Sequence, residues 1–300
     1  MFKLIFFGSF GQYSRLTLEK LLTSPEIDVV TVVTSPARPG NRGQITKNPV
    51  EIFASSQNIP VLTPSTLKQQ LPALPPADFI LVAGYGLLIP PPWLEHPRFM
   101  ALNAHPSLLP LYPGRFPIEW ALLTGEKEVG LSIISMNSGF DSGQLVYQQP
   151  LPVTPTDTRH SLYLELFAQT GQIAPDLFSQ LSNSLLTPWP QPSQPAFYAR
   201  GLTREDGFIP FDIFLSFANQ TPIPPTPWPL LEEVNSHLSS PISPHTLISR
   251  MQLALQPWPG LWTQTTRNIR LKITQLSPLL VQPEGKLPLA WSQIKNHHTN

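Results

Sequence analysis

The stretch "DFILVAG" (78–84) is a near-continuous apolar run that closes on a glycine. Runs of this kind are typical of strands that are covered on both faces of a sheet. The chain holds four more of them: "KLIFFG" (3–8), "DVVTVVT" (28–34), "FMALNAH" (99–105) and "GLSIISM" (130–136). We therefore expect a buried, mostly parallel sheet in the N-terminal part of the chain.

Helical patterns alternate with these strands. They are "YSRLTLEKLL" (13–22), "PVEIFASSQ" (49–57), "PIEWALLTG" (117–125) and "SLYLELFAQTGQIAPDLFSQL" (161–181). The alternation predicts an α/β fold, an open and mostly parallel sheet with flanking helices. In such sheets ligands bind outside the carboxyl ends of the strands, which is where a functional site is expected.

The last hundred residues follow another pattern. One helix is indicated at 245–256, followed by short strand-like pieces at 261–265, 269–276 and 279–285, so we expect a small β-rich domain. The chain also contains 38 prolines, which crowd its second half. The proline-rich stretches cannot form helix interiors or central strands. We interpret "TPWPQPSQP" (187–195) as part of a linker and "TPIPPTPWP" (221–229) as a long loop. The expected domains are 1–187 and 206–300, joined by a linker at 188–205.

Composition excludes several classes of protein. Lys plus Arg and Asp plus Glu both number 19, so no global basic field indicates nucleic-acid binding, and such a surface must be local. Cysteine is absent, which excludes disulfides, thiolate metal sites and cysteine nucleophiles. The N-terminal apolar run is too short for a signal sequence, and no stretch reaches the ~20 apolar residues of a membrane span. We expect a soluble protein of the cytoplasm.

Asn103 and His105 stand at the end of the strand "FMALNAH". At positions i and i+2 of an extended segment, their side chains point to the same face, and Pro106 helps to end the strand there. An amide can stabilise a developing oxyanion while an imidazole adds charge or moves a proton. Local sequence alone equally allows a histidine that only caps a strand end.

Asp141 follows the next strand, between Gly139 and Gly143. Alone it could be a turn aspartate that bonds its own backbone. At the same sheet edge as Asn103 and His105, it becomes a candidate base or proton relay that keeps His105 correctly charged. The chain has no dinucleotide fingerprint, no Walker A motif and no His-x-x-x-His zinc pair, so we expect no metal.

Residues 101–146, "ALNAHPSLLPLYPGRFPIEWALLTGEKEVGLSIISMNSGFDSGQLV", resemble the core of the 10-formyltetrahydrofolate-dependent formyltransferases. The resemblance rests on Asn-x-His, on the Ser-Leu-Leu-Pro that follows it, and on the downstream Asp-x-Gly. It implies a Rossmann-like formyltransferase fold in which Asn103 and His105 stabilise the oxyanion formed when an amine attacks the formyl carbon, and Asp141 assists proton transfer. It further implies that the folate donor, 10-formyltetrahydrofolate, lies along 83–90 and 136–141. The positions assigned to the folate are Leu87, Leu88, Ile89, Ser107, Leu108, Leu109, Pro110 and Gly139. Plain core packing is the alternative for Leu87 to Ile89.

Other segments resemble the methionyl-tRNA formyltransferases of this family. "VVTSPARPGNRG" (32–43) is similar to the loop with which they hold the tRNA acceptor arm, and "FYARGLTREDGFI" (197–209) to their inter-domain signature. "LQPWPGLWTQ" (255–264) and "IRLKI" (269–273) resemble their C-terminal barrel, which implies a small OB-like domain. The resemblance implies formyl transfer to initiator methionyl-tRNA, with Arg38, Arg42 and Lys47 as tRNA contacts. We expect a monomer. Further basic candidates in the second domain are Arg200, Arg204, Arg267, Arg270, Lys272 and Lys286.

Two alternatives keep the chemistry and change the acceptor, either to an amino-sugar nucleotide or to water, as in formyltetrahydrofolate hydrolysis. The chain also departs from the family pattern. Pro113 stands where an Arg is usual, Ser142 replaces a Thr, the loop at 38–47 is less basic than the family pattern, and a proline-rich insertion occupies about 214–245.

Overall fold

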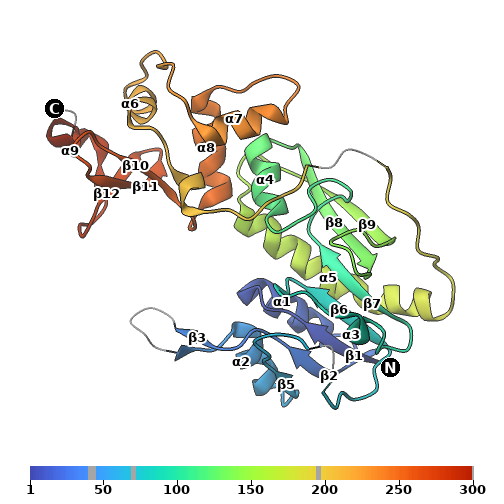
Figure 1. Cartoon of the computed structure of the whole chain (residues 1–300). Helices are drawn as coiled ribbons and strands as arrows, with labels where there is room; N and C mark the ends of the chain where they lie inside the picture. The colour runs from blue at the N-terminus through green and yellow to red at the C-terminus, as the bar shows by residue number, and fades with distance from the viewer. Residues whose placement is uncertain (40–44, 69–71, 194–196, 299–300) are drawn as a thin grey trace. The chain divides into compact units, whose positions relative to one another are not determined.

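The computed structural model describes residues 1–39, 45–68, 72–193 and 197–298 (Figure 1). The chain divides into two compact units. Unit 1 comprises residues 1–114, 128–152 and 160–198, and unit 2 comprises residues 115–127, 153–159 and 199–300. None of the described helices is both long and apolar enough to cross a membrane.

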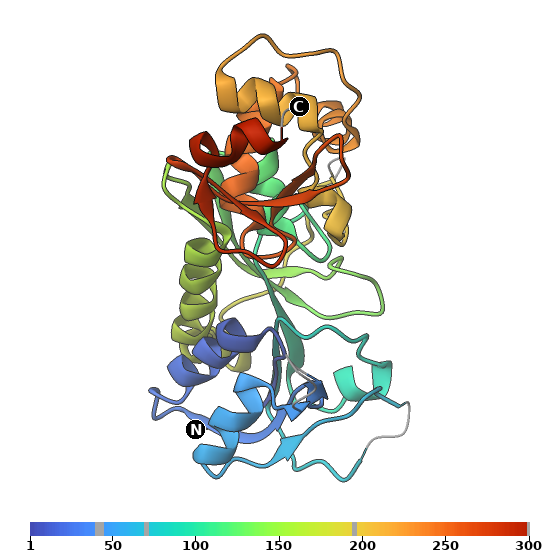
Figure 2. The same ribbon diagram turned by 90° about the vertical axis from the view of Figure 1, so that its left-hand side faces the viewer.

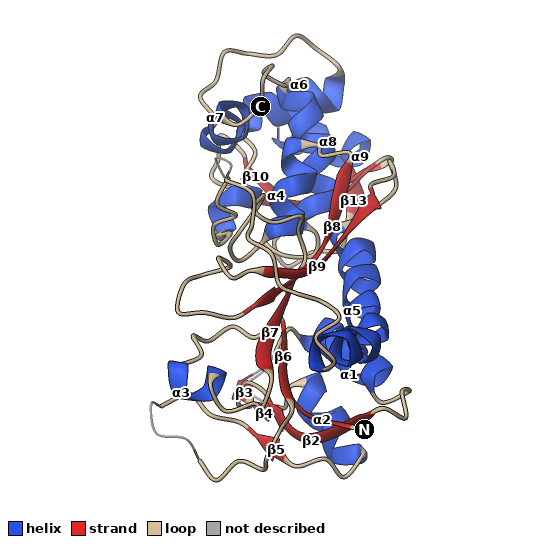
Figure 3. Ribbon diagram, turned by 90° about the vertical axis from the view of Figure 1, so that its right-hand side faces the viewer, coloured by secondary structure: helices blue, strands red, loops and turns tan. Residues whose placement is uncertain are grey.

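Unit 1 is built on a seven-stranded sheet with the strand order β5-β2-β1-β6-β7-β8-β9. The first five strands in this order are parallel, whereas β8 and β9 run antiparallel to their neighbours (Figure 3). The strands are β1 (Phe2–Phe7), β2 (Ile27–Val33), β5 (Val61–Leu62), β6 (Phe79–Ala83), β7 (Met100–His105), β8 (Glu128–Ser135) and β9 (Leu145–Pro152). The mostly parallel α/β sheet predicted from the apolar runs is confirmed.

Strand β9 is the one long strand of this sheet that the sequence pattern missed. It contains Pro150 and Pro152, and proline cannot donate to a sheet ladder. The strand forms because it lies at the sheet edge: Pro150 lies opposite Gly130 and Pro152 opposite Glu128 of β8, and on its outer side the described pairing is confined to Leu145, which bridges to Trp189.

The helices of unit 1 are α1 (Gly11–Leu21), α2 (Pro49–Ser56), α3 (Pro91–Leu94) and α5 (Arg159–Ser182). Helices α1 and α5 lie side by side (Figure 2), and the Thr17 hydroxyl donates to the Phe167 carbonyl at 2.8 Å. A Cβ on Gly171 would stand 2.5 Å from the Thr17 carbonyl oxygen, so this close approach requires glycine. A short ladder of β3 (Arg38–Pro39) and β4 (Ile45–Thr46) precedes α2.

Unit 2 combines helices with a small sheet. Its strands β10 (Leu261–Gln264), β11 (Arg270–Leu276), β12 (Leu279–Pro283) and β13 (Leu289–Ala290) pair antiparallel in chain order. Within the described residues no pairing closes β13 onto β10, so the OB-like barrel is not confirmed. The helices are α4 (Pro117–Thr124), the 3₁₀ helix η2 (Arg204–Gly207), α6 (Phe211–Asn219), α7 (Pro229–Ser236), α8 (Pro244–Leu255) and α9 (Trp291–His298).

The proline-rich insertion is more helical than its composition indicates. Residues 221–228 form the predicted irregular loop, but α6 precedes them and α7 follows them. Pro229 fits because it occupies the first turn of α7, where its missing N–H would have no helical partner in any case.

Helix α4 lies in a different unit from the one that the sequence suggests. All its residues are buried, it packs against α8, and Arg250 donates to the carbonyls of Leu123 and Thr124 at its C-terminal end. A helical pattern predicts the helix itself but not the core that buries it. The division in space therefore differs from the sequence-derived domains 1–187, 188–205 and 206–300.

Candidate active site

Asn103 and His105 end strand β7, which lies between parallel β6 and antiparallel β8. Asn103 is opposite Val82 on one side and Ile134 on the other, and His105 is opposite Ser132. Both side chains therefore leave the same face of the sheet, as the i, i+2 spacing predicts. The His105 residue is only 5% exposed, so its imidazole is held within the protein.

Asp141 reaches the same place from the loop between β8 and β9. Its Oδ1 lies 3.4 Å from the Asn103 amide nitrogen Nδ2 and 3.6 Å from His105 Nδ1. The structure thus brings together the three residues that the sequence singled out, and the carboxylate faces both the amide and the imidazole.

One main-chain carbonyl fixes the tautomer of His105. The Tyr112 carbonyl oxygen lies 3.0 Å from His105 Nε2, and a carbonyl can only accept a hydrogen bond. Nε2 therefore carries a proton, and Nδ1 is the ring nitrogen that faces Asp141. Because Nδ1 faces Asp141, protonation creates an imidazolium paired with that carboxylate.

Asp141 is held in an unusual backbone conformation. Its φ of 48° lies in the left-handed region, which costs a non-glycine residue about 1–3 kcal/mol. The second carboxylate oxygen accepts a hydrogen bond from the main-chain N–H of Gly114 at 2.9 Å. Gly114 has a φ of 120°, a conformation that favours glycine. Its main-chain donor to the carboxylate directly follows Pro113, the residue that replaces the usual Arg of the family.

Gly143, two residues after Asp141, cannot be replaced without a steric clash. A Cβ on Gly143 would stand 1.6 Å from the carbonyl oxygen of Ser135, so no other residue fits without moving the loop. Asn137 Oδ1 accepts from the Gly139 N–H at 2.9 Å and from the Ser142 hydroxyl at 3.2 Å. Ser142, where the family usually has Thr, thus keeps a hydroxyl that bonds within the loop.

A buried hydroxyl network anchors the chain that follows His105. Ser132 Oγ donates to the Ser107 carbonyl at 2.6 Å and accepts from the Leu109 N–H at 3.0 Å. The Gln148 amide donates to Ser132 Oγ and to the Leu109 carbonyl, both at 2.9 Å. These bonds tie residues 107–109 to β8 and β9.

The positions assigned to the folate differ in their surroundings. Ile89 and Leu109 are buried in apolar clusters, and the Ser107 hydroxyl donates to the Leu111 carbonyl at 2.7 Å. Leu88 is 64% exposed. Leu108 lies over Gly130, and the remaining positions are partly buried or exposed: Leu87, Pro110 and Gly139. Folate contact at all eight stays a prediction.

Tyr85, in the loop after β6, was not among the predicted positions. Its hydroxyl is buried and has no hydrogen-bond partner among the described residues, and its ring meets the edge of Phe7 at 5.2 Å between centroids. Burial raises the pKa of Tyr85 to about 12, so the hydroxyl keeps its proton at neutral pH.

The proposed RNA contacts are only partly visible. Arg42 lies outside the described residues, and of Arg38 only the main chain is described, paired with Thr46 of β4. The Lys47 ammonium lies 2.8 Å from a Glu51 carboxylate oxygen, so this exposed charge already has an acidic neighbour.

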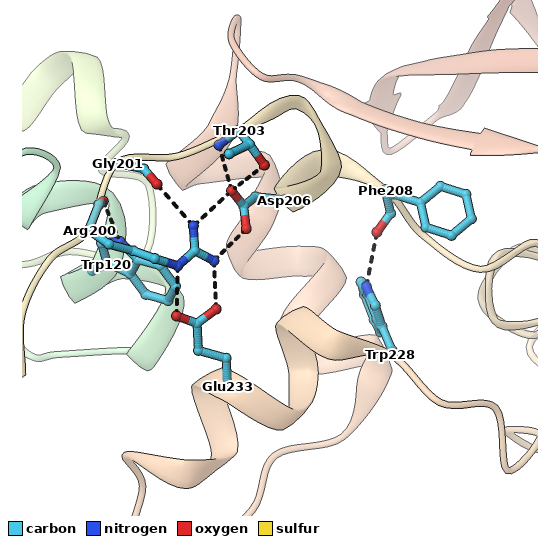
Figure 4. Close-up of polar contacts among 8 residues, drawn as sticks. All are labelled: Trp120, Arg200, Gly201, Thr203, Asp206, Phe208, Trp228 and Glu233. Carbon is cyan, nitrogen blue, oxygen red and sulfur yellow. Dashed lines mark hydrogen bonds and ion pairs between the residues drawn. The ribbon is translucent and has the colours of Figure 1, made fainter.

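Arg200 serves a structural purpose in unit 2. Its guanidinium lies between the carboxylates of Asp206 and Glu233 (Figure 4), and its N–H groups make five hydrogen bonds, to these carboxylates and to the Gly201 carbonyl. It also stacks over the Trp120 ring, 4.8 Å from the centroid. Since every N–H is used, Arg200 has none left for a phosphate, which corrects its place among the basic candidates of the second domain.

Sequence reasoning missed the main-chain groups of the site. The Gly114 N–H and the Tyr112 carbonyl hold Asp141 and His105, and such groups are present at every residue regardless of its side chain. It also missed Gln191, whose amide donates to the Asp141 carbonyl at 2.7 Å, because its proline-rich surroundings indicate a linker.

The arrangement suits attack of a neutral nucleophile on a carbonyl. An amide donor, an imidazole with an exchangeable proton and a carboxylate converge on one point at the carboxyl edge of the sheet. Among the described residues, no three His, Cys, Asp or Glu side chains gather as a metal site would require.

Comparison with known proteins agrees with this geometry. Residues 2–177, which contain all three side chains, match the family model described as Formyl transferase. The chain belongs to the formyl transferase family. Its curated relatives include the methionyl-tRNA formyltransferase of Microcystis aeruginosa, 35% identical over 217 residues that cover 69% of this chain and 65% of that protein. Another is the methionyl-tRNA formyltransferase of Roseiflexus castenholzii, 32% identical over 276 residues that cover 90% of this chain and 78% of the relative.

Solved formyltransferase structures share the fold. A 4-N formyltransferase from Francisella tularensis matches with a TM-score of 0.60 and 12% identity, covering 91% of this chain and 97% of its own. The N-formyltransferase from Helicobacter canadensis, solved with folinic acid and dTDP-3-aminofucose, gives a TM-score of 0.57 at 16% identity and covers 91% of this chain and 87% of its own. At these identities the likeness establishes the fold alone.

Proposed function

We propose that this member of the formyl transferase family transfers the formyl group of 10-formyltetrahydrofolate to the amino group of methionyl-initiator tRNA, the formylation step of translation initiation. The observation that carries the proposal is the convergence of Asn103, His105 and Asp141 within 3.4–3.6 Å. Relatives named methionyl-tRNA formyltransferase support the acceptor, and the match to the Roseiflexus enzyme covers 90% of this chain.

In the proposed reaction, the neutral amine of the methionyl group attacks the formyl carbon of the donor. The carbonyl oxygen becomes an oxyanion, which the Asn103 amide stabilises as a preorganised donor and the protonated His105 stabilises through its positive charge. Asp141 takes the proton that the attacking nitrogen loses. Collapse of the intermediate breaks the bond between the formyl carbon and N10 of the folate. Asp141 returns its proton to N10, and the products are tetrahydrofolate and formyl-methionyl-tRNA.

The rest of the rate enhancement comes from positioning the two substrates. Because the enzyme holds both reactants in a reactive geometry, the reaction does not depend on their chance encounter in solution. The folate positions expected on either side of the site lie at 87–89 and 107–110, and Gly139 lies in the loop that carries Asp141. Initiator tRNA would be held in part by Arg38, Arg42 and Lys47, which all belong to the 38–47 segment. A monomer is sufficient for this reaction, because all three central side chains belong to unit 1 of one chain.

The test is an assay with the purified protein, the folate donor and charged initiator tRNA. Formyl-methionine released from the tRNA is expected at catalytic enzyme concentrations and is measured by mass spectrometry. Its absence with enzyme in excess, together with formylation of a 4-amino-sugar nucleotide, would replace the tRNA by the sugar acceptor. Formate release with neither acceptor would instead indicate a hydrolase.

A further inference from the structure

Residues 187–193 lie along the loop that carries Asp141, although their prolines indicate a linker. Trp189 and Leu145 exchange two main-chain hydrogen bonds, at 2.8 and 2.9 Å. Two residues further on, the Gln191 amide donates to the main-chain carbonyl of Asp141 at 2.7 Å and to that of Gly143 at 2.9 Å. Residues 187–193 therefore pair with Leu145 at the end of the loop that carries Asp141, and the Gln191 side chain then bonds the main chain of that loop.

The two hydrogen bonds from Gln191 hold a part of the loop, the main chain at Asp141 and Gly143, that the other side-chain contacts described for this loop do not reach. Asn137 bonds the first half of the loop, and Gly114 bonds the carboxylate of Asp141. The carbonyls on either side of Ser142 are bonded by Gln191. Asp141 occupies a left-handed conformation that other contacts must stabilise, and the two bonds from Gln191 are contacts of this kind.

Gln191 is suited to this task by its neighbours. Pro190 and Pro192 fix the φ angles on both sides, so a stiff backbone presents the amide. Further along, the Phe197 ring meets the Tyr112 ring edge-on, with centroids 5.4 Å apart, and the Tyr112 carbonyl is the partner of His105 Nε2. The same stretch of chain thus contacts the supports of both Asp141 and His105.

We infer that Gln191 is a positioning residue for formyl transfer: by clamping the main chain at Asp141 and Gly143, its amide holds the Asp141 carboxylate against Asn103 and His105. This inference rests on the proposed function, because it concerns the step in which Asp141 takes the proton of the amine. Misplacement of a reacting group by about 1 Å can cost on the order of 100-fold in rate.

Gln191→Glu replaces the donating amide with a carboxylate that repels both carbonyls, and Gln191→Met removes the donor at similar size. Both variants should lower kcat about tenfold or more while the KM for the folate donor changes less than twofold. Gln144→Glu, the same charge change at an exposed position of the same loop, should keep the activity of the unmodified protein. Thermal unfolding confirms that each variant is folded.

A double-mutant cycle separates positioning from general damage. If Gln191 acts through Asp141, Gln191→Glu should change the residual kcat of Asp141→Asn less than twofold. An equal loss in both backgrounds, or an unchanged kcat in Gln191→Glu and Gln191→Met, overturns the inference.

A second measurement does not depend on the acceptor. The ring ¹⁵N resonances of His105, assigned by their loss in His105→Gln, should shift in Gln191→Met as they do in Asp141→Asn and stay unchanged in Gln144→Glu. Unshifted resonances in Gln191→Met would refute the clamp. Absence of formyl-methionyl-tRNA in the assay of the unmodified protein would instead refute the proposed acceptor and leave this result to stand.

Discussion

At residue 105, one main-chain carbonyl determines which ring nitrogen can do chemistry. Tyr112 engages Nε2, which leaves Nδ1 facing Asp141. The identity of the three central residues follows from the spacing of Asn-x-His and Asp-x-Gly. The orientation of the imidazole does not, because it depends on a carbonyl that no side-chain pattern reveals.

The first prediction concerns the two side chains that stabilise the oxyanion, Asn103 by its amide N–H and His105 by its charge. Asn103→Ala and His105→Ala should each lower kcat by about 10²–10³, the usual cost of removing one preorganised electrostatic interaction with an oxyanion. Single-turnover rates of formyl transfer measure the effect, with Asn219→Ala, an exposed amide at the end of α6, as control. Rates within tenfold of the unmodified protein would exclude these side chains from the reaction.

At the scale of elements, Arg200 joins three parts of unit 2. It stacks on α4 through Trp120 and pairs with Asp206 of η2 and Glu233 of α7 (Figure 4). Burial alone would raise the pKa of Asp206, but the hydrogen bonds from Arg200 and Thr203 outweigh burial and hold its pKa below the ordinary value. The folded state therefore stabilises the ionised form of Asp206. Its contribution to the free energy of unfolding is complete above the ordinary carboxyl pKa and is lost as the pH falls through the lowered pKa of the folded state.

Asp206→Asn should therefore reduce the free energy of unfolding at pH 7 by about 1–2 kcal/mol, a value kept small because the Arg200 side chain is 34% exposed. The difference from the unmodified protein should shrink as the pH is lowered toward 3. Thermal unfolding across this range measures it, and the neighbouring exposed Glu205→Gln is the control. A destabilisation that does not vary with pH would show that the ion pair is not its source.

Over the whole molecule, charge balances, with 19 basic and 19 acidic residues. Long-range attraction of RNA must therefore come from local groups. Arg200 is committed to its carboxylates, which leaves Arg38, Arg42, Lys47 and the other basic residues predicted in the second domain as the candidate contacts.

Replacement of Arg38 and Arg42 by alanine tests whether these two residues contact the tRNA. If both contact phosphate, the KM for tRNA should rise at least tenfold, and the slope of log affinity against log salt should fall by about one unit per lost contact. Turnover of a small amine acceptor should be unaffected. Equal losses with tRNA and with the small acceptor would assign the two arginines a role in folding.

The sequence by itself determined the alternating strands and helices, the parallel part of the sheet and the three residues at its carboxyl edge, because side-chain periodicity and motif spacing are local. It missed β9, whose prolines are tolerated only at an edge, and the helices of the proline-rich insertion. Only the tertiary structure decided which core receives α4, how main-chain groups hold His105 and Asp141, and that the Gln191 amide bonds the main chain at Asp141 and Gly143. These depend on contacts between segments distant in the chain, and such contacts leave no periodic signal in the sequence.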